Sequence, residues 1–258
     1  MTSVALQIKT SSVKVKEIVK TVTLSEIRSG RHFFYNVVGD PAAKVVDDSM
    51  RLFTTNNGTM GGPCDLRINK VVAALFDDGT GKRWYRAKII EKKTRGKATV
   101  LFVDYGNIAV VPTATHLRPL DTALDVTRIA PIAKEAQLSL IQVRSLDDDD
   151  GVDAARMLSS LAWGKKMEVH IHCQIDGKAF VTLTDPTDDS NASVNEQLVS
   201  SGLALKAKKV DVDAMMAKMI DSNSIVKLSA DISAAQDSAR KNRTGMWRYG
   251  DIGEEDEE

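Results

Sequence analysis

Residues 71–79 read Val-Val-Ala-Ala-Leu-Phe-Asp-Asp-Gly, residues 83–87 read Arg-Trp-Tyr-Arg-Ala, and residues 101–107 read Leu-Phe-Val-Asp-Tyr-Gly-Asn. Each segment combines β-branched, apolar or aromatic residues with a neighbouring Asp, Gly or Asn turn, which predicts three short strands. Their aromatic residues fall where a small barrel would gather them at one mouth. Ring faces attract poorly hydrated cations, and methylated arginine and lysine are cations of this kind. The stretch therefore predicts a binding site for a modified side chain.

The strands around this stretch are short and closely spaced. We expect them at 71–76, 83–91, 97–103 and 108–112, separated by Asp78-Gly79, Arg95-Gly96 and Gly106-Asn107. Four or five strands in about fifty residues are too few for a large sheet, so a compact barrel is the economical arrangement.

The two flanks of this barrel look incomplete when taken alone. Before it, the sequence predicts strands at 20–27 and 32–38 and a helix opened by Asp40-Pro41. After it come strand-like parts in 133–143, a helix at 152–163, a hairpin around Asp176-Gly177, and helices at 194–201 and before Gly245. We therefore expect one domain interrupted by another, with the flanks meeting in space.

Composition indicates a globular protein. The 258 residues contain 35 Lys and Arg against 35 Asp and Glu, and this neutrality argues against coating nucleic acid through bulk charge. Cys64 and Cys173 lack metal-type spacing or a disulfide framework, which favours a reducing compartment. Without a secretory signal or an apolar segment of about 20 residues, we expect a cytoplasmic or nuclear protein with no membrane partner. Residues 1–17 are expected to be a poorly ordered lead-in, and the acidic 251–258 a solvated tail.

Two sets of motifs carry a family resemblance. The first is Phe-Asp-Asp-Gly at 76–79 with Trp-Tyr-Arg-Ala at 84–87 and Phe-Val-Asp-Tyr-Gly-Asn at 102–107; the second is Ala-Gln-Asp-Ser-Ala-Arg at 235–240 with Met-Trp-Arg-Tyr-Gly-Asp at 246–251. Over about 18–251, the chain resembles the C-terminal extended Tudor region of the Tudor staphylococcal nuclease (Tudor-SN) family. The first set is shared by Tudor domains broadly, and the second is more particular to this family.

The resemblance implies an α+β, mostly β fold. A Tudor, SH3-like barrel at 66–120 would be inserted into a split staphylococcal-nuclease-like OB-fold made from 18–65 and 121–250, and the two would pack as one body. It also implies an aromatic cage for symmetric dimethylarginine, with Asp104 supporting the turn. The implied site residues are Phe76, Tyr85, Phe102, Tyr105 and Asn107. Relatives often carry Tyr where this chain has Phe102, so one hydroxyl is lost and the ring face is kept.

Strand aromatics are more often core than cage, and for Trp84 we adopt the core interpretation because it alternates with Tyr85. Phe102 and Tyr105 are three residues apart, so the intervening turn must bring Tyr105 back to the same face. Tyr85→Ala is expected to remove most binding without unfolding the barrel. Three or four rings, less the cost of ordering a peptide, predict a Kd of roughly micromolar to near-millimolar order.

The function implied by the resemblance is recognition of symmetric dimethylarginine in Arg/Gly-rich tails, such as those of Sm-type or Argonaute-type proteins. The family is associated with RNA silencing, splicing and transcription coactivation. The alternative is an RNA-binding module, because OB-folds bind single strands through cationic grooves. The competing interpretation of its basic clusters is that they form solvated helix faces. The candidate residues for RNA are Lys165, Lys166, Lys206, Lys208, Lys209, Arg240, Lys241 and Arg243.

Catalysis is not expected. Nuclease chemistry of the staphylococcal type needs carboxylates that hold calcium, a base and phosphate-binding arginines. The charges around Glu26, Arg28, Asp40 and Lys44 do not form such a set, and the corresponding family unit is regarded as non-catalytic. His170 and His172 share a strand face but lack a third ligand, and Asp147 to Asp150 resemble a helix-capping turn rather than a calcium loop. No cofactor or metal is expected.

Overall fold

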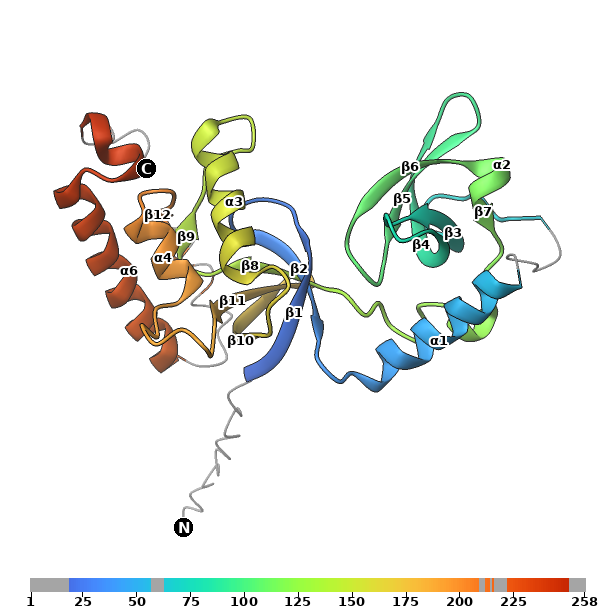
Figure 1. The fold of residues 1–258 in the computed structure, drawn as a ribbon, viewed down its shortest axis with the longest axis horizontal. Helices are drawn as coiled ribbons and strands as arrows, with labels where there is room; N and C mark the ends of the chain where they lie inside the picture. The colour runs from blue at the N-terminus through green and yellow to red at the C-terminus, as the bar shows by residue number, and fades with distance from the viewer. Residues whose placement is uncertain (1–18, 57–62, 209–211, 214, 216–221, 251–258) are drawn as a thin grey trace, which may run out of the picture.

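The structure is a computed structural model that describes residues 19–56, 63–208, 212–213, 215 and 222–250. It has two lobes joined by extended segments, with a β-barrel and its helices in one lobe and a five-stranded sheet in the other (Figure 1). The expected lead-in at 1–17, the acidic tail at 251–258 and Lys209 lie outside the described residues. Among the residues that are described, no helix is long and apolar enough to cross a membrane.

The first lobe is a closed barrel built from both flanks of the sequence. Its strand order is β1-β10-β11-β8-β2. All neighbours are antiparallel except β11 and β8, which are parallel. The strands are β1 (Val19–Ile27), β2 (His32–Val37), β8 (Lys134–Leu138), β10 (Met167–Ile175) and β11 (Lys178–Thr184). The flanks therefore meet in space, as the sequence predicts.

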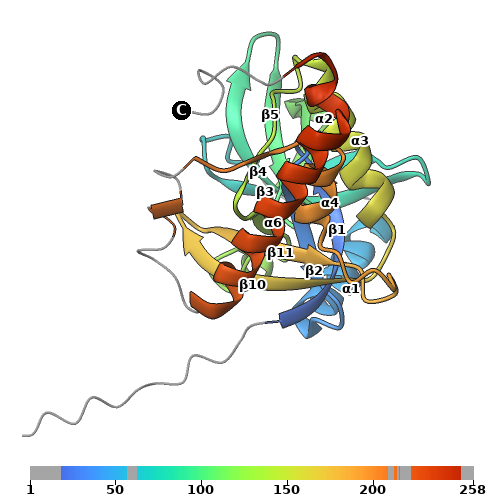
Figure 2. The same ribbon diagram turned by 90° about the vertical axis from the view of Figure 1, so that its left-hand side faces the viewer.

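Helices pack around this barrel, and the long C-terminal one lies on the side that faces away from the other lobe. In Figure 1 α6 lies at the outer edge, and Figure 2 looks onto it with the second lobe behind. Leu158, Leu198 and Ile232 from three helices join the barrel core. The helices are α3 (Asp149–Ala162), α4 (Val194–Ser200) and α6 (Ser222–Asn242), with the short strands β9 (Ile141–Gln142) and β12 (Leu205–Lys206) and the 3-10 turn η2 (Gly245–Tyr249) beside them.

Local sequence signals place most element ends. Asp176 and Gly177 both have positive φ (52° and 79°), as the tight turn joining β10 and β11 requires. The helix expected at 152–163 begins earlier, at Asp149, because the Asp148 side chain accepts a hydrogen bond from the amide of Asp150.

The second lobe is a five-stranded antiparallel sheet in the order β6-β5-β4-β3-β7 that curls around its own small core (Figure 1). Its elements are β3 (Val71–Asp77), β4 (Lys82–Lys93), β5 (Lys97–Phe102), β6 (Ile108–Pro112), the short α2 (Thr113–His116) and β7 (Leu117–Arg118). The four strands expected from the sequence are present. The two-residue β7 supplies the fifth by pairing with Ala73 and Ala74 of β3.

Helix α1 (Pro41–Thr55) connects the lobes and packs under the second sheet. Its cap forms as the sequence predicts, because the Asp40 side chain accepts a hydrogen bond from the Ala42 amide. Met50 and Phe53 pack against Trp84, whose ring lies 5.7 Å from Phe53 in an edge-on arrangement. Trp84 thus faces α1 while Tyr85 faces the sheet's own core, as strand alternation requires.

Candidate functional site

Four aromatic rings of the second lobe form a continuous row. Phe76 comes from β3, Tyr85 from β4, Phe102 from the end of β5 and Tyr105 from the following turn. Ring centroids are 5.0 Å apart for Phe76–Phe102, 6.0 Å for Tyr85–Phe102 and 5.3 Å for Tyr85–Tyr105. The last two contacts are edge-on, so consecutive rings turn their faces in different directions. The structure therefore brings all four sequence-predicted rings together.

The turn after β5 returns Tyr105 to the same side as Phe102. The amides of Tyr105 and Gly106 both donate to the carbonyl of Phe102, at 3.2 and 2.8 Å. Gly106 has φ +97°, which glycine adopts without a Cβ penalty. The Phe102 amide donates to the carbonyl of Asn107 at 2.9 Å and closes the turn from the other side. This is the reversal that the three-residue spacing requires.

The rings differ in how much solvent they meet. Phe102 is 1% exposed and Tyr85 is 8% exposed, whereas Tyr105 is 38% exposed. Phe102 and Tyr85 also belong to the small core of the sheet. The core and cage interpretations are therefore compatible here, because Phe102 forms a buried floor and Tyr105 an outer wall.

These rings line a cavity of about 370 Å³. The predicted Asn107 lines it too, with the carboxylates of Asp77 and Asp78. The Tyr85 hydroxyl donates to Asp78 Oδ2 at 2.8 Å, which fixes the ring's orientation. Hydrogen bonds from Thr80 and then from Tyr85 lower the pKa of Asp78 to about 2, so it is ionised at neutral pH. An aromatic hollow beside fixed negative charge is suited to a cation.

The other lobe supplies the opposite side of this cavity, and the sequence does not predict this. Its lining residues are Ser25 and Glu26 of β1 and Trp163 after α3. Ser25 is the extra residue of a β-bulge, and its hydroxyl donates to the Tyr105 carbonyl at 2.7 Å. A bulge depends on the register with a distant strand, so the sequence gives no signal for it. For Trp163 the sequence offers a weak signal, because this large aromatic stands at the last position of the helix expected at 152–163.

A buried ion pair anchors the turn that carries Tyr105. Arg86 is fully buried, and its Nε donates to Asp104 Oδ2 at 2.9 Å. Its guanidinium also donates to the carbonyls of Leu124, Ile129 and Ala130. The family resemblance implies that Asp104 supports the turn, and these are the contacts that hold its carboxylate.

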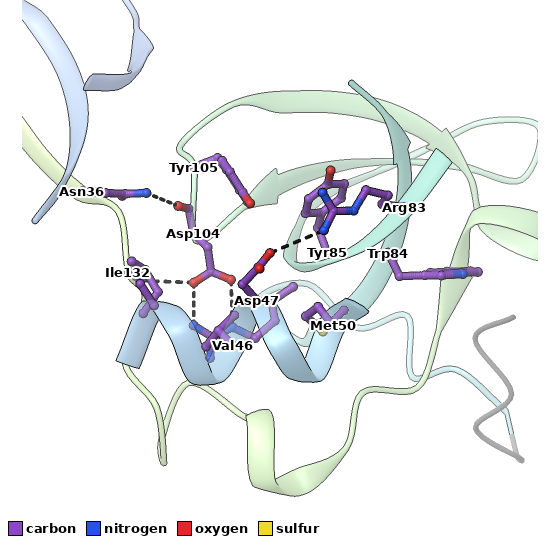
Figure 3. Close-up of a pocket in the computed structure, with 12 residues that line it drawn as sticks. Asn36, Val46, Asp47, Met50, Arg83, Trp84, Tyr85, Asp104, Tyr105 and Ile132 are labelled. Atoms are coloured by element: carbon purple, nitrogen blue, oxygen red, sulfur yellow. Dashed lines mark hydrogen bonds and ion pairs between the residues drawn. The ribbon is translucent and has the colours of Figure 1, made fainter. Parts of the chain in front are cut away.

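A smaller cavity of about 170 Å³ lies behind the row of rings, between β4 and α1 (Figure 3). Tyr85 and Tyr105 line both cavities. In the smaller one Asp47 of α1 reaches Arg83 at 3.5 Å, and the Arg83 guanidinium lies 5.9 Å from the Tyr85 ring centroid (Figure 3). An ion pair already occupies this side of Tyr85, so the larger cavity is the candidate ligand site.

The described basic residues predicted for RNA fall into two groups, one after α3 and one near β12 and α6. Lys165 and Lys166 follow α3, and Lys165 pairs with Asp185 at 2.9 Å. Lys206 of β12 donates to Ser233 of α6 at 3.0 Å, which places it beside the helix that carries Arg240. Lys208, Lys241 and Arg243 belong to the same C-terminal part of the fold.

The candidate residues for metal or nuclease chemistry have structural partners. His170 stacks on His172 with centroids 4.7 Å apart, and His172 Nε2 lies 2.7 Å from the Thr182 hydroxyl. Within the described residues no group of three or more His, Cys, Asp or Glu side chains could hold a metal ion. Asp40 caps α1 and Lys44 pairs with Asp48, so neither joins Glu26.

Comparisons with known proteins agree with this architecture. A family model described as Tudor domain matches residues 14–140. The Staphylococcal nuclease domain-containing protein 1 of Drosophila melanogaster is 30% identical over 202 residues, which is 78% of this chain and 20% of that protein. The chain therefore spans about a fifth of the length of this relative.

Solved structures show the same fold. The extended Tudor domain of Drosophila melanogaster Tudor-SN superposes with a TM-score of 0.72 at 27% identity, covering 89% of this chain and all of that one. The extended Tudor domain TD3 of mouse TDRD1, solved with a MILI peptide containing dimethylarginine 45, has a TM-score of 0.65 at 22% identity. It covers 74% of this chain and 94% of the mouse domain.

The five-stranded sheet is inserted in the sequence between the two parts that form the closed barrel, and this arrangement and the relatives together define an extended Tudor domain. Within that class, the chain belongs to the Tudor-SN family and corresponds to its extended Tudor region.

Proposed function

We propose that this domain binds symmetric dimethylarginine in Arg/Gly-rich protein tails, and that it does so without catalysis. The observation that supports it best is the convergence of Phe76, Tyr85, Phe102 and Tyr105 on one cavity that Asn107 also lines. The solved mouse relative carries a dimethylarginine peptide, which adds support from the same fold. Tails of the Sm or Argonaute type, in the cytoplasm or the nucleus, are partners of suitable chemistry.

The proposed selectivity comes from hydration and shape. Methyl groups lower the cost of stripping water from a guanidinium and fill space between rings, while the positive charge remains for the ring faces. Asn107 makes no side-chain hydrogen bond within the described residues, so its amide is available to orient the guanidinium. Unmodified arginine costs more to desolvate and binds more weakly.

The test is a titration with one Arg/Gly peptide in three forms: unmodified, symmetrically dimethylated and asymmetrically dimethylated. Tyr85→Ala is a poor variant, because Tyr85 belongs to the core and its removal leaves a cavity there. Tyr105→Ala is better because that wall is partly exposed. We expect the symmetric form to bind most tightly, and Tyr105→Ala to weaken it roughly ten-fold, measured by amide chemical shifts.

Tyr249→Ala is the matched control, because Tyr249 is an almost fully exposed tyrosine on η2 and lies outside the cavity. It should bind like the unchanged protein. Equal affinity for all three peptides, or a Tyr105→Ala variant that is folded and binds normally, would exclude the cage.

RNA binding is the alternative, favoured by the position of Lys206 beside α6 and its last-turn residues Arg240 and Lys241. Phosphate contacts release counterions, so RNA affinity would fall steeply with salt, whereas cage binding would change modestly. A titration with single-stranded RNA and with the methylated peptide, repeated from about 50 to about 200 mM salt, separates RNA binding from cage binding. Phosphate contacts lose much of their affinity over that range.

A further inference from the structure

On the side of the ligand cavity formed by the first lobe lies a tryptophan that is not buried in the protein core. Trp163 follows α3, and its side chain is 50% exposed, whereas Trp84 and Trp247 are both buried. It lines the same cavity as the four rings of the other lobe. An exposed large aromatic inside a concave site marks a binding surface more often than a packing surface.

Glu26 lies on the same side of the cavity and has unused hydrogen-bonding capacity. Within the described residues its only ionic contact is Arg28, whose Nε is 4.0 Å from Glu26 Oε1, too far for a hydrogen bond. The Arg28 guanidinium instead donates to the Gly106 carbonyl at 2.5 Å and lies over the Phe34 ring. Partial burial raises the pKa of the Glu26 carboxyl, and the nearby Arg28 only partly opposes this. A ligand cation would supply the missing donor.

The other two carboxylates of the cavity already have donors. Asp78 accepts from the Thr80 amide and from the Tyr85 hydroxyl, and Asp77 accepts from the Gly79 amide at 3.1 Å. Glu26 is therefore the carboxylate with the most capacity left for a ligand.

The chemistry of Trp163 and Glu26 together fits a guanidinium. Tryptophan is the strongest cation–π partner among the aromatic residues, and arginine stacks flat on its face. A carboxylate can then accept two parallel hydrogen bonds from the same group. This pair is separate from the cage, because the cage rings come from the second lobe and Trp163 and Glu26 come from the first.

Arg/Gly repeats place a second arginine within reach. In an extended peptide, residues two apart point to the same side and lie about 6.5–7 Å apart. The cage and the Trp163–Glu26 pair line one cavity of about 370 Å³, so neighbouring side chains of one peptide can enter both. We propose that Trp163 and Glu26 form a second subsite, which binds an unmodified arginine two residues from the methylated arginine of the same tail. This inference rests on the proposed function.

The test uses three peptides with one symmetric dimethylarginine each. The first has an arginine two residues away, the second has glutamine there, and the third keeps the arginine but moves it to the far end of the peptide. The third has the same net charge as the first and so controls for bulk attraction. We expect the first to bind about five- to ten-fold more tightly than either of the others.

Variants assign that preference to the subsite. Trp163→Leu, which keeps an apolar side chain but no ring, and Glu26→Gln should each remove most of the preference, and Trp163→Phe should retain part of it. Leu146→Ala, an exposed apolar position before α3, is the control and should bind all three peptides as the unchanged protein does. Since the other two tryptophans are buried, a fluorescence change on binding that is absent in Trp163→Phe reports contact at Trp163.

The possible results separate the two proposals. A preference that survives Trp163→Leu and Glu26→Gln, or equal binding of the first and third peptides, overturns the second subsite and leaves the cage intact. A folded Tyr105→Ala variant that still binds the glutamine peptide normally overturns the cage itself. Should Trp163→Leu fail to fold, Glu26→Gln and Trp163→Phe still decide the result.

Discussion

At the scale of single residues, Arg86 shows how one buried charge holds the site. Its guanidinium makes five hydrogen bonds, two to Asp104 and three to backbone carbonyls of residues 124–130. A buried ion pair contributes little relative to apolar packing, but removing one partner leaves the other charge buried without compensation. The residue before Tyr105 is Asp104, so the orientation of a cage wall depends on this pair.

Arg86→Ala should therefore destabilise the protein by about 3–5 kcal/mol, because Asp104 and three carbonyls lose their donor. The measurement is the free energy of unfolding in urea. Arg83→Ala is the matched control on the same strand, since its side chain is 37% exposed and its contact with Asp47 is a 3.5 Å surface pair. The free energy of unfolding of Arg83→Ala should fall by no more than about 1 kcal/mol. Equal losses for both variants would contradict a special role for Arg86.

At the scale of elements, the turn between β5 and β6 is the contact that joins the two lobes at the cavity. A Cβ on Gly106 would lie 2.3 Å from Cγ of Phe34 on β2, so the glycine allows the turn to touch the other lobe. The Ser25 hydroxyl and the Arg28 guanidinium bond to carbonyls of the same turn. The position of Tyr105 thus depends on packing against β1 and β2.

Gly106→Ala should destabilise the protein by about 2–5 kcal/mol, because it adds both a clash with Phe34 and a side chain at positive φ. It should also weaken methylated-peptide binding, since Tyr105 is the preceding residue. Gly79→Ala separates the two causes: Gly79 has φ +90° but nothing within 4 Å of an added Cβ. The free energy of unfolding of Gly79→Ala should fall by about 1–2 kcal/mol. Unchanged peptide affinity in a folded Gly106→Ala protein would show that Tyr105 does not need this contact.

The sequence predicts those elements whose signals are local. The Asp40 cap, the Asp176-Gly177 turn and the strands around Trp84 and Tyr85 depend on neighbours in the chain, and the structure has them. The four rings could be predicted because they stand in a motif shared by Tudor domains, and that resemblance implies one cage for all four. The opposite wall of the cavity could not, because Ser25 and Trp163 reach it through a bulge and through the packing of segments about 80 and 60 residues away from Tyr105.

At the scale of the whole molecule, the inserted five-stranded sheet depends on residues outside its own strands. Trp84 packs on Met50 and Phe53 of α1, which precedes the sheet. On the other side, the backbone acceptors of Arg86 and the Ile132 amide that donates to Asp104 all lie beyond residue 120. The strands expected within 66–120 therefore share one core with α1 and with residues up to 132. We infer that 41–132, rather than 66–120, is the smallest unit that folds around the cage.

Two fragments test this inference. Fragment 66–120 exposes the Trp84 face and leaves Arg86 without its carbonyl acceptors, so we expect no cooperative thermal transition by circular dichroism. Fragment 41–132 should unfold cooperatively, and Arg86→Ala within it should abolish the transition. The fragment should still prefer a methylated peptide, but more weakly than the whole domain, because it lacks the contacts of Ser25, Arg28 and Phe34 with the turn that carries Tyr105. Because 41–132 lacks Glu26 and Trp163, it should bind peptides with one or two arginines equally. If 66–120 proved as stable as 41–132, the contacts of Trp84 and Arg86 with the flanking segments would be incidental to the barrel, and the cage would be an independent module.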